Sequence, residues 1–161
     1  MNFKFENIVI IINENLLDIF NKYIQDDDKK KEAGGILTGL IYNDKIEICS
    51  CSIPNSYDKR SRYNFVRSKI TAQEFLTTRF SISDGREIYL GEWHTHPEQI
   101  PTPSYCDVLS FRKTIKTNKF YSDLFFMIIV GTKGLYIAIY NKKGKICYES
   151  SLELSKLRAT S

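Results

Sequence analysis

The residues best suited to chemistry are the two histidines of the chain, His94 and His96, which stand two positions apart. They stand at the end of a stretch, 87–95, whose pattern predicts a β-strand, and His96 follows it directly. Residues i and i+2 of a strand project from the same face, so both imidazoles can converge on one point. Asp107 lies in the first turn of a helix predicted to begin after the N-cap residue Ser104. Two imidazoles, one carboxylate and a water form a normal catalytic zinc set, with three protein ligands and an open fourth position.

The wider pattern around these residues resembles a known family. The chain reads Gly-Glu-Trp-His-Thr-His-Pro-Glu over 91–98, and Ser104 and Asp107 complete the spacing H-x-H-x(7)-S-x-x-D. Upstream, 32–39 reads Glu-Ala-Gly-Gly-Ile-Leu-Thr-Gly. Both stretches are similar to the signature of the JAMM, or MPN-plus, metalloproteases, in which an E-x-G-G-I-L-x-G strand precedes the histidines. The residues around the histidines, 91–98, more closely resemble the prokaryotic branch of the family (Prok-JAB). That branch includes deconjugating peptidases encoded beside bacterial E1- and E2-like enzymes, among them a member of the type II CBASS anti-phage operons.

The resemblance implies a role for each residue of the pattern. His94, His96 and Asp107 would bind one zinc ion per chain, Glu32 would be the catalytic acid/base, and Ser104 would support the oxyanion. The chemistry of such a site agrees with these roles. Zinc lowers the pKa of a bound water to about 7, and a carboxylate must then carry the proton to the departing amine. Glu32 is suited to this because it opens a strand, at a sheet end where it can face the zinc ligands.

The elements that must position these residues follow from apolar periodicity and capping residues. Residues 54–68, which carry Arg60 and Arg62, are polar and are predicted to form a long loop. Trp93 alternates away from the histidines and is predicted to lie in the core. We expect strands over 3–12, 36–42, 45–53, 87–95, 124–130, 134–140 and 145–150, and helices over 13–25, 70–81, 104–116 and, as a short frayed tail, 152–161.

This order of elements favours an α/β (mixed α+β) fold, in which helices cover the faces of a mixed sheet. The resemblance implies the same architecture, the MPN/JAMM domain, whose topology is related to that of cytidine deaminases. A chain of 161 residues fits one domain, so we expect a single metallopeptidase domain over residues 1–161.

Composition excludes several classes of protein. Apolar runs such as 8–12 and 124–130 are far shorter than the roughly 20 residues of a membrane-spanning helix. The N-terminus lacks the basic start and apolar stretch of a signal peptide. The four scattered cysteines are therefore expected to be free thiols in a reducing cytosol, which makes the predicted location cytoplasmic. A net charge of +4 is too mild to argue for a nucleic-acid protein.

The resemblance also implies a substrate class. The bond cleaved would be an isopeptide or peptide bond after the C-terminal glycine, or another small residue, of a ubiquitin-like tail. The partners would be a conjugate of a ubiquitin-like or nucleotidyltransferase protein and the E1- and E2-like enzymes of the operon. An extended tail can add as a strand to an exposed sheet edge and deliver its last carbonyl to the zinc. We expect Arg60 and Arg62, in the polar loop, to contact the tail or an acidic partner.

Three alternative functions are open at this point. RadC-like DNA-associated proteins share the H-x-H-x(7)-S-x-x-D spacing, but they usually continue H-N-H-P-S-G, whereas this chain reads His-Thr-His-Pro-Glu-Gln over 94–99. Non-catalytic MPN-minus scaffolds lack the metal ligands that this chain keeps. Zinc deaminases need P-C-x-x-C in addition to H-x-E, and the sequence has no P-C-x-x-C.

Overall fold

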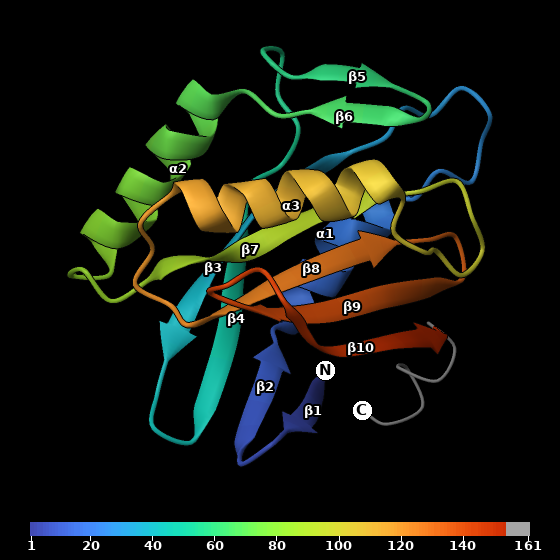
Figure 1. Ribbon diagram of the computed structural model, residues 1–161. Coiled ribbons are helices and arrows are strands. Elements are labelled where there is room, and N and C mark those ends of the chain that lie inside the picture. The colour runs from blue at the N-terminus through green and yellow to red at the C-terminus, as the bar shows by residue number, and fades with distance from the viewer. Residues whose placement is uncertain (154–161) are drawn as a thin grey trace.

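The computed structural model of the protein describes residues 1–153, which fold around one large mixed sheet (Figure 1). Eight strands pair in the order β1-β2-β4-β3-β7-β8-β9-β10. The pairs β2–β4 and β7–β8 are parallel and the other pairs are antiparallel. The elements are β1 (Asn2–Phe5), β2 (Ile8–Ile12), α1 (Glu14–Tyr23), β3 (Gly34–Ile41), β4 (Lys45–Cys51), β5 (Lys59–Ser61), β6 (Asn64–Val66), α2 (Lys69–Ile82), β7 (Ile88–Thr95), α3 (Tyr105–Thr117), β8 (Leu124–Val130), β9 (Gly134–Asn141) and β10 (Ile146–Glu153).

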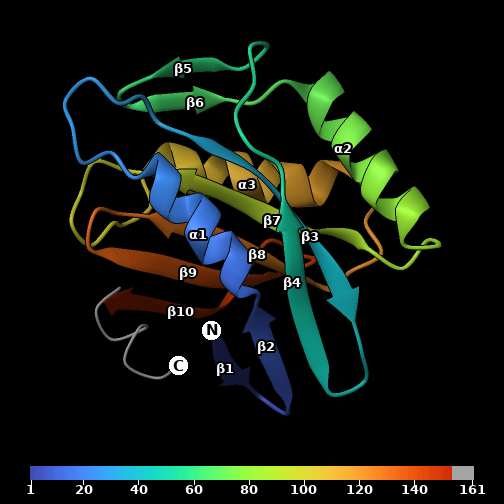
Figure 2. The same cartoon turned by 180° about the vertical axis from the view of Figure 1, so that it is seen from behind.

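Helices cover both faces of this sheet, as the views from opposite sides show (Figure 1, Figure 2). Phe20 of α1 packs against Trp93 in one apolar cluster. Phe111 of α3 and Ala72 of α2 belong to a second cluster on the opposite face. Strand β8 is apolar throughout because its side chains alternate between the two clusters, as expected for a strand with helices on both faces. The mixed sheet and its three helices confirm the predicted fold class.

Strand β7 contains a bulge just before the histidines. Leu37 of β3 pairs with Gly91 and Thr38 pairs with Tyr89, so Leu90 is an extra residue in β7. Such a bulge changes which face the following side chains project from. Beyond it, Trp93 points towards α1 and is buried, which confirms its predicted place in the core. A Cβ at position 91 would overlap the carbonyl oxygen of Phe126, so the close approach of β8 requires glycine here.

Three predicted elements differ from the structure. The strand expected over 3–12 is a hairpin, because the chain turns at Glu6, which has a positive φ of 52°. The loop expected over 54–68 contains the hairpin β5–β6, a separate two-stranded sheet whose three-residue strands are too short to show an alternating pattern. Of the helix expected over 152–161, Leu152 and Glu153 belong to β10, and 154–161 lie outside the described residues.

Two further features concern the chain as a whole. Within residues 1–153, the helices fall short of the length and apolar character needed to cross a membrane. The four cysteines are free thiols, as the sequence predicted, and none of them forms a disulfide.

Candidate metal centre

Strand β7 ends by presenting both imidazoles to one point. His94 pairs with Gly34 of β3, and the backbone N–H of His96 donates to the carbonyl of Val130 at 2.9 Å, which extends the pairing with β8 past the strand end. The Nε2 atoms of His94 and His96 lie 3.2 Å apart. The last outward-facing residue of the strand and the residue just past its end have thus converged, as the i, i+2 spacing predicted.

The N-terminus of α3 brings Asp107 to the same point. Ser104 caps the helix in a capping box, since its hydroxyl accepts from the Asp107 N–H at 3.1 Å and its own N–H donates to Asp107 Oδ2 at 2.7 Å. Asp107 Oδ1 lies 3.4 Å from His94 Nε2, and Oδ2 lies 3.3 Å from His96 Nε2. Burial raises the pKa of Asp107, but the two histidines and the bond from Ser104 outweigh it and hold that pKa well below its usual range.

Glu32 reaches the site from the irregular segment between α1 and β3. Its side chain is buried, and a carboxylate oxygen lies within 4.8 Å of a ring nitrogen of each histidine. Burial raises the pKa of Glu32, while the charges of His94 and His96 lower it and that of Asp107 raises it again, with a net rise. Glu32 is therefore the carboxylate of this site that takes up a proton more readily.

The donor set fits a divalent metal such as zinc. With zinc bonds of about 2.0–2.2 Å and tetrahedral angles, ligand atoms must lie roughly 3.3–3.5 Å apart. The two Nε2 atoms are 3.2 Å apart, and Asp107 approaches them with different oxygens, Oδ1 at 3.4 Å from His94 and Oδ2 at 3.3 Å from His96, so each of these pairs of donor atoms has about this separation. The Asp107 carboxylate outweighs the effect of burial and raises the pKa of His96, so a bound cation would replace protons that the site otherwise attracts. The structure thus brings together Glu32 and the three predicted ligands.

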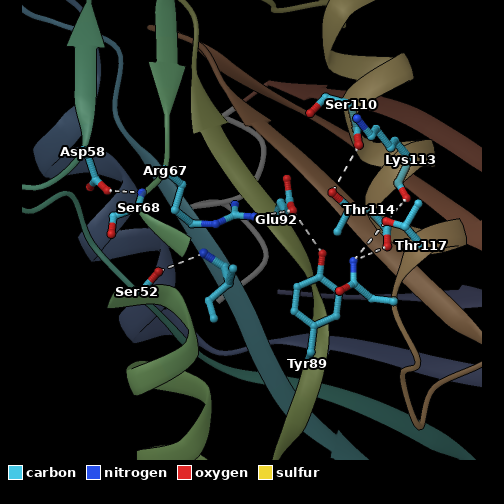
Figure 3. Close-up of polar contacts among 12 residues, drawn as sticks. Ser52, Asp58, Arg67, Ser68, Tyr89, Glu92, Ser110, Lys113, Thr114 and Thr117 are labelled. Atoms are coloured by element: carbon cyan, nitrogen blue, oxygen red, sulfur yellow. Dashed lines mark hydrogen bonds and ion pairs between the residues drawn. The ribbon is translucent and has the colours of Figure 1, made fainter. Parts of the chain in front are cut away.

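A groove of about 350 Å³ runs from the site between β6 and α3. Its lining includes Asn64, Phe65 and Val66 of β6 together with Glu32, His94 and Asp107 of the metal site. Figure 3 shows an ion pair inside it, in which Arg67 Nη2 donates to Glu92 Oε1 at 2.7 Å. The hydroxyl of Tyr89 donates to the same carboxylate oxygen at 3.2 Å, so this wall of the groove is polar and held by side-chain bonds.

Arg60 and Arg62 are not among the lining residues of the groove and contact the segment that carries Glu32. The Nε of Arg60 donates to the carbonyl of Glu32 at 2.8 Å. The guanidinium of Arg62 donates to the carbonyl of Asp27 at 2.9 Å and pairs with the Asp28 carboxylate at 3.0 Å. The contact of both arginines with substrate stays a prediction.

Two buried polar residues near the site were missed in the sequence. Thr95 stands between the histidines but projects from the opposite face, where its hydroxyl accepts from the Ala33 N–H at 2.9 Å. That hydroxyl donates to Gln25 Oε1 at 2.9 Å. Both side chains are buried. The position of Thr95 within H-x-H was the available signal, whereas Gln25 carries no local mark because its partners are distant in sequence.

Comparison with known proteins agrees with this geometry. Residues 20–143 match the family model of prokaryotic homologs of the JAB domain. A Pseudomonas aeruginosa protein named CD-NTase/cGAS isopeptidase is 32% identical over 133 residues, which are 83% of this chain and 84% of that protein. An Escherichia coli protein of the same name is 35% identical over 133 residues, or 83% and 82% of the two chains. A third such protein, from Vibrio cholerae, is 35% identical over 106 residues, or 66% and 65%.

A solved structure supports the fold. The solution structure of a Desulfitobacterium hafniense protein superposes with a TM-score of 0.55 at 18% identity, covering 89% of this chain and 90% of that one.

Proposed function

Since the chain belongs to the prokaryotic JAB-domain family, we propose that it is a zinc-dependent isopeptidase that acts on protein conjugates in an anti-phage CBASS system. The observation that carries this proposal is the convergence of Glu32 with His94, His96 and Asp107 beside a groove that three of these residues help to line. A cluster of two imidazoles and two carboxylates has the composition of a hydrolytic zinc site rather than of a structural one.

In this proposal three residues would hold the zinc ion, namely His94, His96 and Asp107. Bound there, zinc would polarise the scissile carbonyl and lower the pKa of a water molecule. Glu32 would take the proton of the attacking water and pass it to the nitrogen of the leaving amine as the carbon–nitrogen bond breaks. The raised pKa of Glu32 supports both halves of this transfer. The Ser104 hydroxyl would donate to the oxyanion of the tetrahedral intermediate.

The groove between β6 and α3 is the proposed binding place for the chain that precedes the scissile bond. It has a volume of about 350 Å³, and its lining includes Glu32, His94 and Asp107. An extended tail with small terminal residues would fit such a channel and would bring its last carbonyl to the zinc ligands. The bond cleaved would therefore follow the C-terminal residue of a ubiquitin-like or similarly conjugated protein.

The proposed substrate is a conjugate formed through the C-terminus of a CD-NTase, the nucleotidyltransferase of the system. Relatives at 32–35% identity are named for isopeptidase action on CD-NTase or cGAS, and they support this assignment. The E1- and E2-like proteins that make the conjugate would be the operon partners. We also propose that residues 1–161 form one metallopeptidase domain and that the enzyme acts in the cytoplasm, where its free thiols would stay reduced.

The test joins a metal measurement to a cleavage assay. The purified protein is analysed for zinc and incubated with a fusion that carries a CD-NTase C-terminal tail before a reporter protein. Glu32→Gln and chelator treatment are the negative controls, and Glu74→Gln, an exposed change on α2, is the matched control. We expect one zinc per chain and cleavage after the tail that only Glu32→Gln and the chelator abolish.

Other outcomes would contradict the proposal in different ways. Zinc without cleavage of any tail would reject the substrate class and leave the metal site in place. Absence of zinc would reject the ligand assignment itself.

A further inference from the structure

Glu32 lies in a segment without regular secondary structure. Residues 24–33 contain neither helix nor strand, so no ladder of local hydrogen bonds fixes the Glu32 backbone. A catalytic carboxylate must nevertheless stay within about 0.5 Å of its working position. The contacts that hold Glu32 must therefore come from other parts of the fold.

One set of contacts comes from strand β5. The Nε of Arg60 donates to the Glu32 carbonyl at 2.8 Å, and its Nη2 reaches the Lys31 carbonyl at 3.4 Å. The Glu32 N–H donates to the Ser61 carbonyl at 2.8 Å. Both main-chain polar groups of Glu32 are thus bonded to the β5–β6 hairpin. Within residues 1–153, the Arg60 guanidinium forms no ion pair with a carboxylate, and its bonds go to these carbonyls.

A second set comes from the opposite face of β7. Thr95 accepts from the Ala33 N–H through its hydroxyl, and its own N–H donates to the Ala33 carbonyl at 2.8 Å. Ala33 follows Glu32 directly, and Thr95 stands between the two histidines. The residue next to the carboxylate is therefore bonded to the residue between the metal ligands. This junction sets the distance between the two halves of the site.

Gln25, two residues after the end of α1, forms further hydrogen bonds at this junction. It is 2% exposed, its Oε1 accepts from the Thr95 hydroxyl, and its Nε2 donates to the carbonyls of Arg62 at 2.8 Å and Lys30 at 3.3 Å. One side chain thus joins β7, the hairpin and the segment that precedes Glu32. A buried amide that is fully bonded in this way resists displacement, because any movement leaves polar groups unpaired.

We propose that Arg60, Thr95 and Gln25 are positioning residues that hold the main chain around Glu32 and so fix its carboxylate against the metal ligands. The proposal rests on the proposed function of Glu32 and deepens it. Arg60 was expected from the sequence to contact substrate. In this proposal it acts through the main chain of Glu32, and the groove binds the substrate. Loss of a positioning residue should lower kcat and leave KM unchanged, since a shift of about 1 Å in a reacting group can cost about a hundredfold in rate.

The first test compares Thr95→Val with Thr95→Ser in the zinc-loaded protein. Valine has nearly the shape of threonine but cannot accept from Ala33 or donate to Gln25, whereas serine keeps the hydroxyl. Hydrogen–deuterium exchange of the peptide that contains Ala33 measures how well the Ala33 N–H is protected by this bond, and it needs no substrate. We expect about tenfold faster exchange in Thr95→Val and near wild-type exchange in Thr95→Ser. We also expect kcat to fall about tenfold to a hundredfold in the valine variant alone.

The second test uses Arg60, which is partly exposed, so its replacement leaves the core intact. Arg60→Gln is compared with Arg60→Lys and with Lys59→Gln, an exposed neighbour on β5 that undergoes the same change of charge. We expect Arg60→Gln to lower kcat and to speed exchange in 26–33, Arg60→Lys to restore part of both, and Lys59→Gln to change neither.

Two results would overturn the proposal. One is unchanged exchange around Ala33 in both Thr95→Val and Arg60→Gln. The other is a higher KM with unchanged kcat in Arg60→Gln, which would return Arg60 to the substrate. If the wild-type protein cleaves no tail, the proposed function fails, whereas the exchange measurements still decide whether these residues hold the Glu32 segment.

Discussion

Glu32 and Asp107 are two carboxylates at one site whose surroundings move their pKa values in opposite directions. Burial dominates at Glu32 and raises its pKa. At Asp107 burial is outweighed by His94, His96 and the capping bond from Ser104, and the pKa falls well below its usual range. Divergent pKa values in a pair of neighbouring acids are a usual sign of divided roles. Glu32 is thereby suited to carry a proton and Asp107 to stay ionised as a ligand.

This division predicts that replacing the proton carrier lowers activity, whereas replacing a metal ligand lowers zinc content. Glu32→Gln should keep one zinc per chain and lower kcat by about 10²–10⁴, because the proton carrier is lost and the three ligands remain. His94→Ala, His96→Ala and Asp107→Ala should each lower the zinc content. Metal analysis and steady-state kinetics on the four variants check both statements. Full zinc and activity in Asp107→Ala would remove it from the ligand set.

Ser104 has two possible tasks that a single substitution separates. Its hydroxyl accepts from the Asp107 N–H, which leaves its proton free to donate to an oxyanion. Glycine at an N-cap costs only a few tenths of a kcal/mol, whereas loss of an oxyanion donor costs about 10²–10³ in kcat. We expect Ser104→Gly to unfold at nearly the wild-type temperature but to turn over slowly, with Ser104→Thr active. An unchanged kcat in Ser104→Gly would restrict Ser104 to capping.

At the scale of elements, strand β7 separates two tasks by its two faces. Glu92 and His94 project towards α3 and the groove, while Trp93 and Thr95 project towards α1. The bulge at Leu90 and Gly91 sets this division, since one extra residue changes which side chains follow on each face. On one face Trp93 packs against α1 and Thr95 holds the segment next to Glu32. On the other face His94 contributes to the candidate metal centre. An unbroken alternation from the start of β7 would have placed Tyr89 and Glu92 on opposite faces, although they are hydrogen-bonded.

The opposite end of β7 is tied to α2 by an ion pair whose carboxylate is buried and whose guanidinium is partly exposed. Glu87 accepts from Arg79 at 2.7 Å and from the Thr38 hydroxyl of β3. Burial raises the pKa of Glu87, but the bonds from Arg79, Thr38 and Ser50 outweigh it and leave the pKa below its ordinary value of 4.5. A depressed folded-state pKa contributes stability above the unfolded-state pKa, and that contribution is lost as the pH falls through the folded-state value.

Glu87→Gln should therefore be less stable than the wild type by about 1–3 kcal/mol at pH 7, and the difference should shrink below about pH 4.5. Denaturant unfolding of both proteins between pH 7 and pH 3 measures this, with the exposed Glu74→Gln on α2 as control. A difference that stays constant with pH would mean that the Glu87 charge contributes nothing.

At the scale of the whole molecule, the site gathers residues from three separate parts of the chain. Glu32 comes from the segment before β3, the histidines from the end of β7, and Asp107 from the start of α3. The sheet also curves so that its two outer strands approach each other, and Phe3 of β1 stacks on Tyr148 of β10 at 5.2 Å. A metal at the site would thus join a helix to the central strands of a curved sheet.

Zinc should consequently stabilise the whole fold. At a free concentration about 1,000 times its Kd, a ligand that binds only the folded state adds about 4 kcal/mol. For a chain of this size that corresponds to a rise in Tm of roughly 8–16 °C. Thermal unfolding of the metal-free and zinc-loaded protein measures the rise, and a chelator should reverse it. Asp107→Ala should show a much smaller rise; the same rise would mean that zinc binds elsewhere.

The local features of this protein could be predicted from its sequence. The spacing H-x-H at a strand end predicted that His94 and His96 share a face, and Ser104 predicted the start of a helix with Asp107 in its first turn. Alternating and continuous apolar runs predicted most strands, and the order of elements predicted the fold class. These features depend on contacts between residues close in sequence, where periodicity and capping preferences are directly visible.

The contacts between distant segments depend on the packing of the whole fold. The hairpin β5–β6 and the turn at Glu6 left no periodic signal, because their strands are short and their stability comes from contacts elsewhere in the fold. The bonds of Arg60 to the Glu32 carbonyl and of Gln25 to Thr95 join residues 28 and 70 positions apart. No local pattern encodes such pairs, since their partners are chosen by the packing of the sheet and helices. That packing brings Glu32 to within reach of the two histidines.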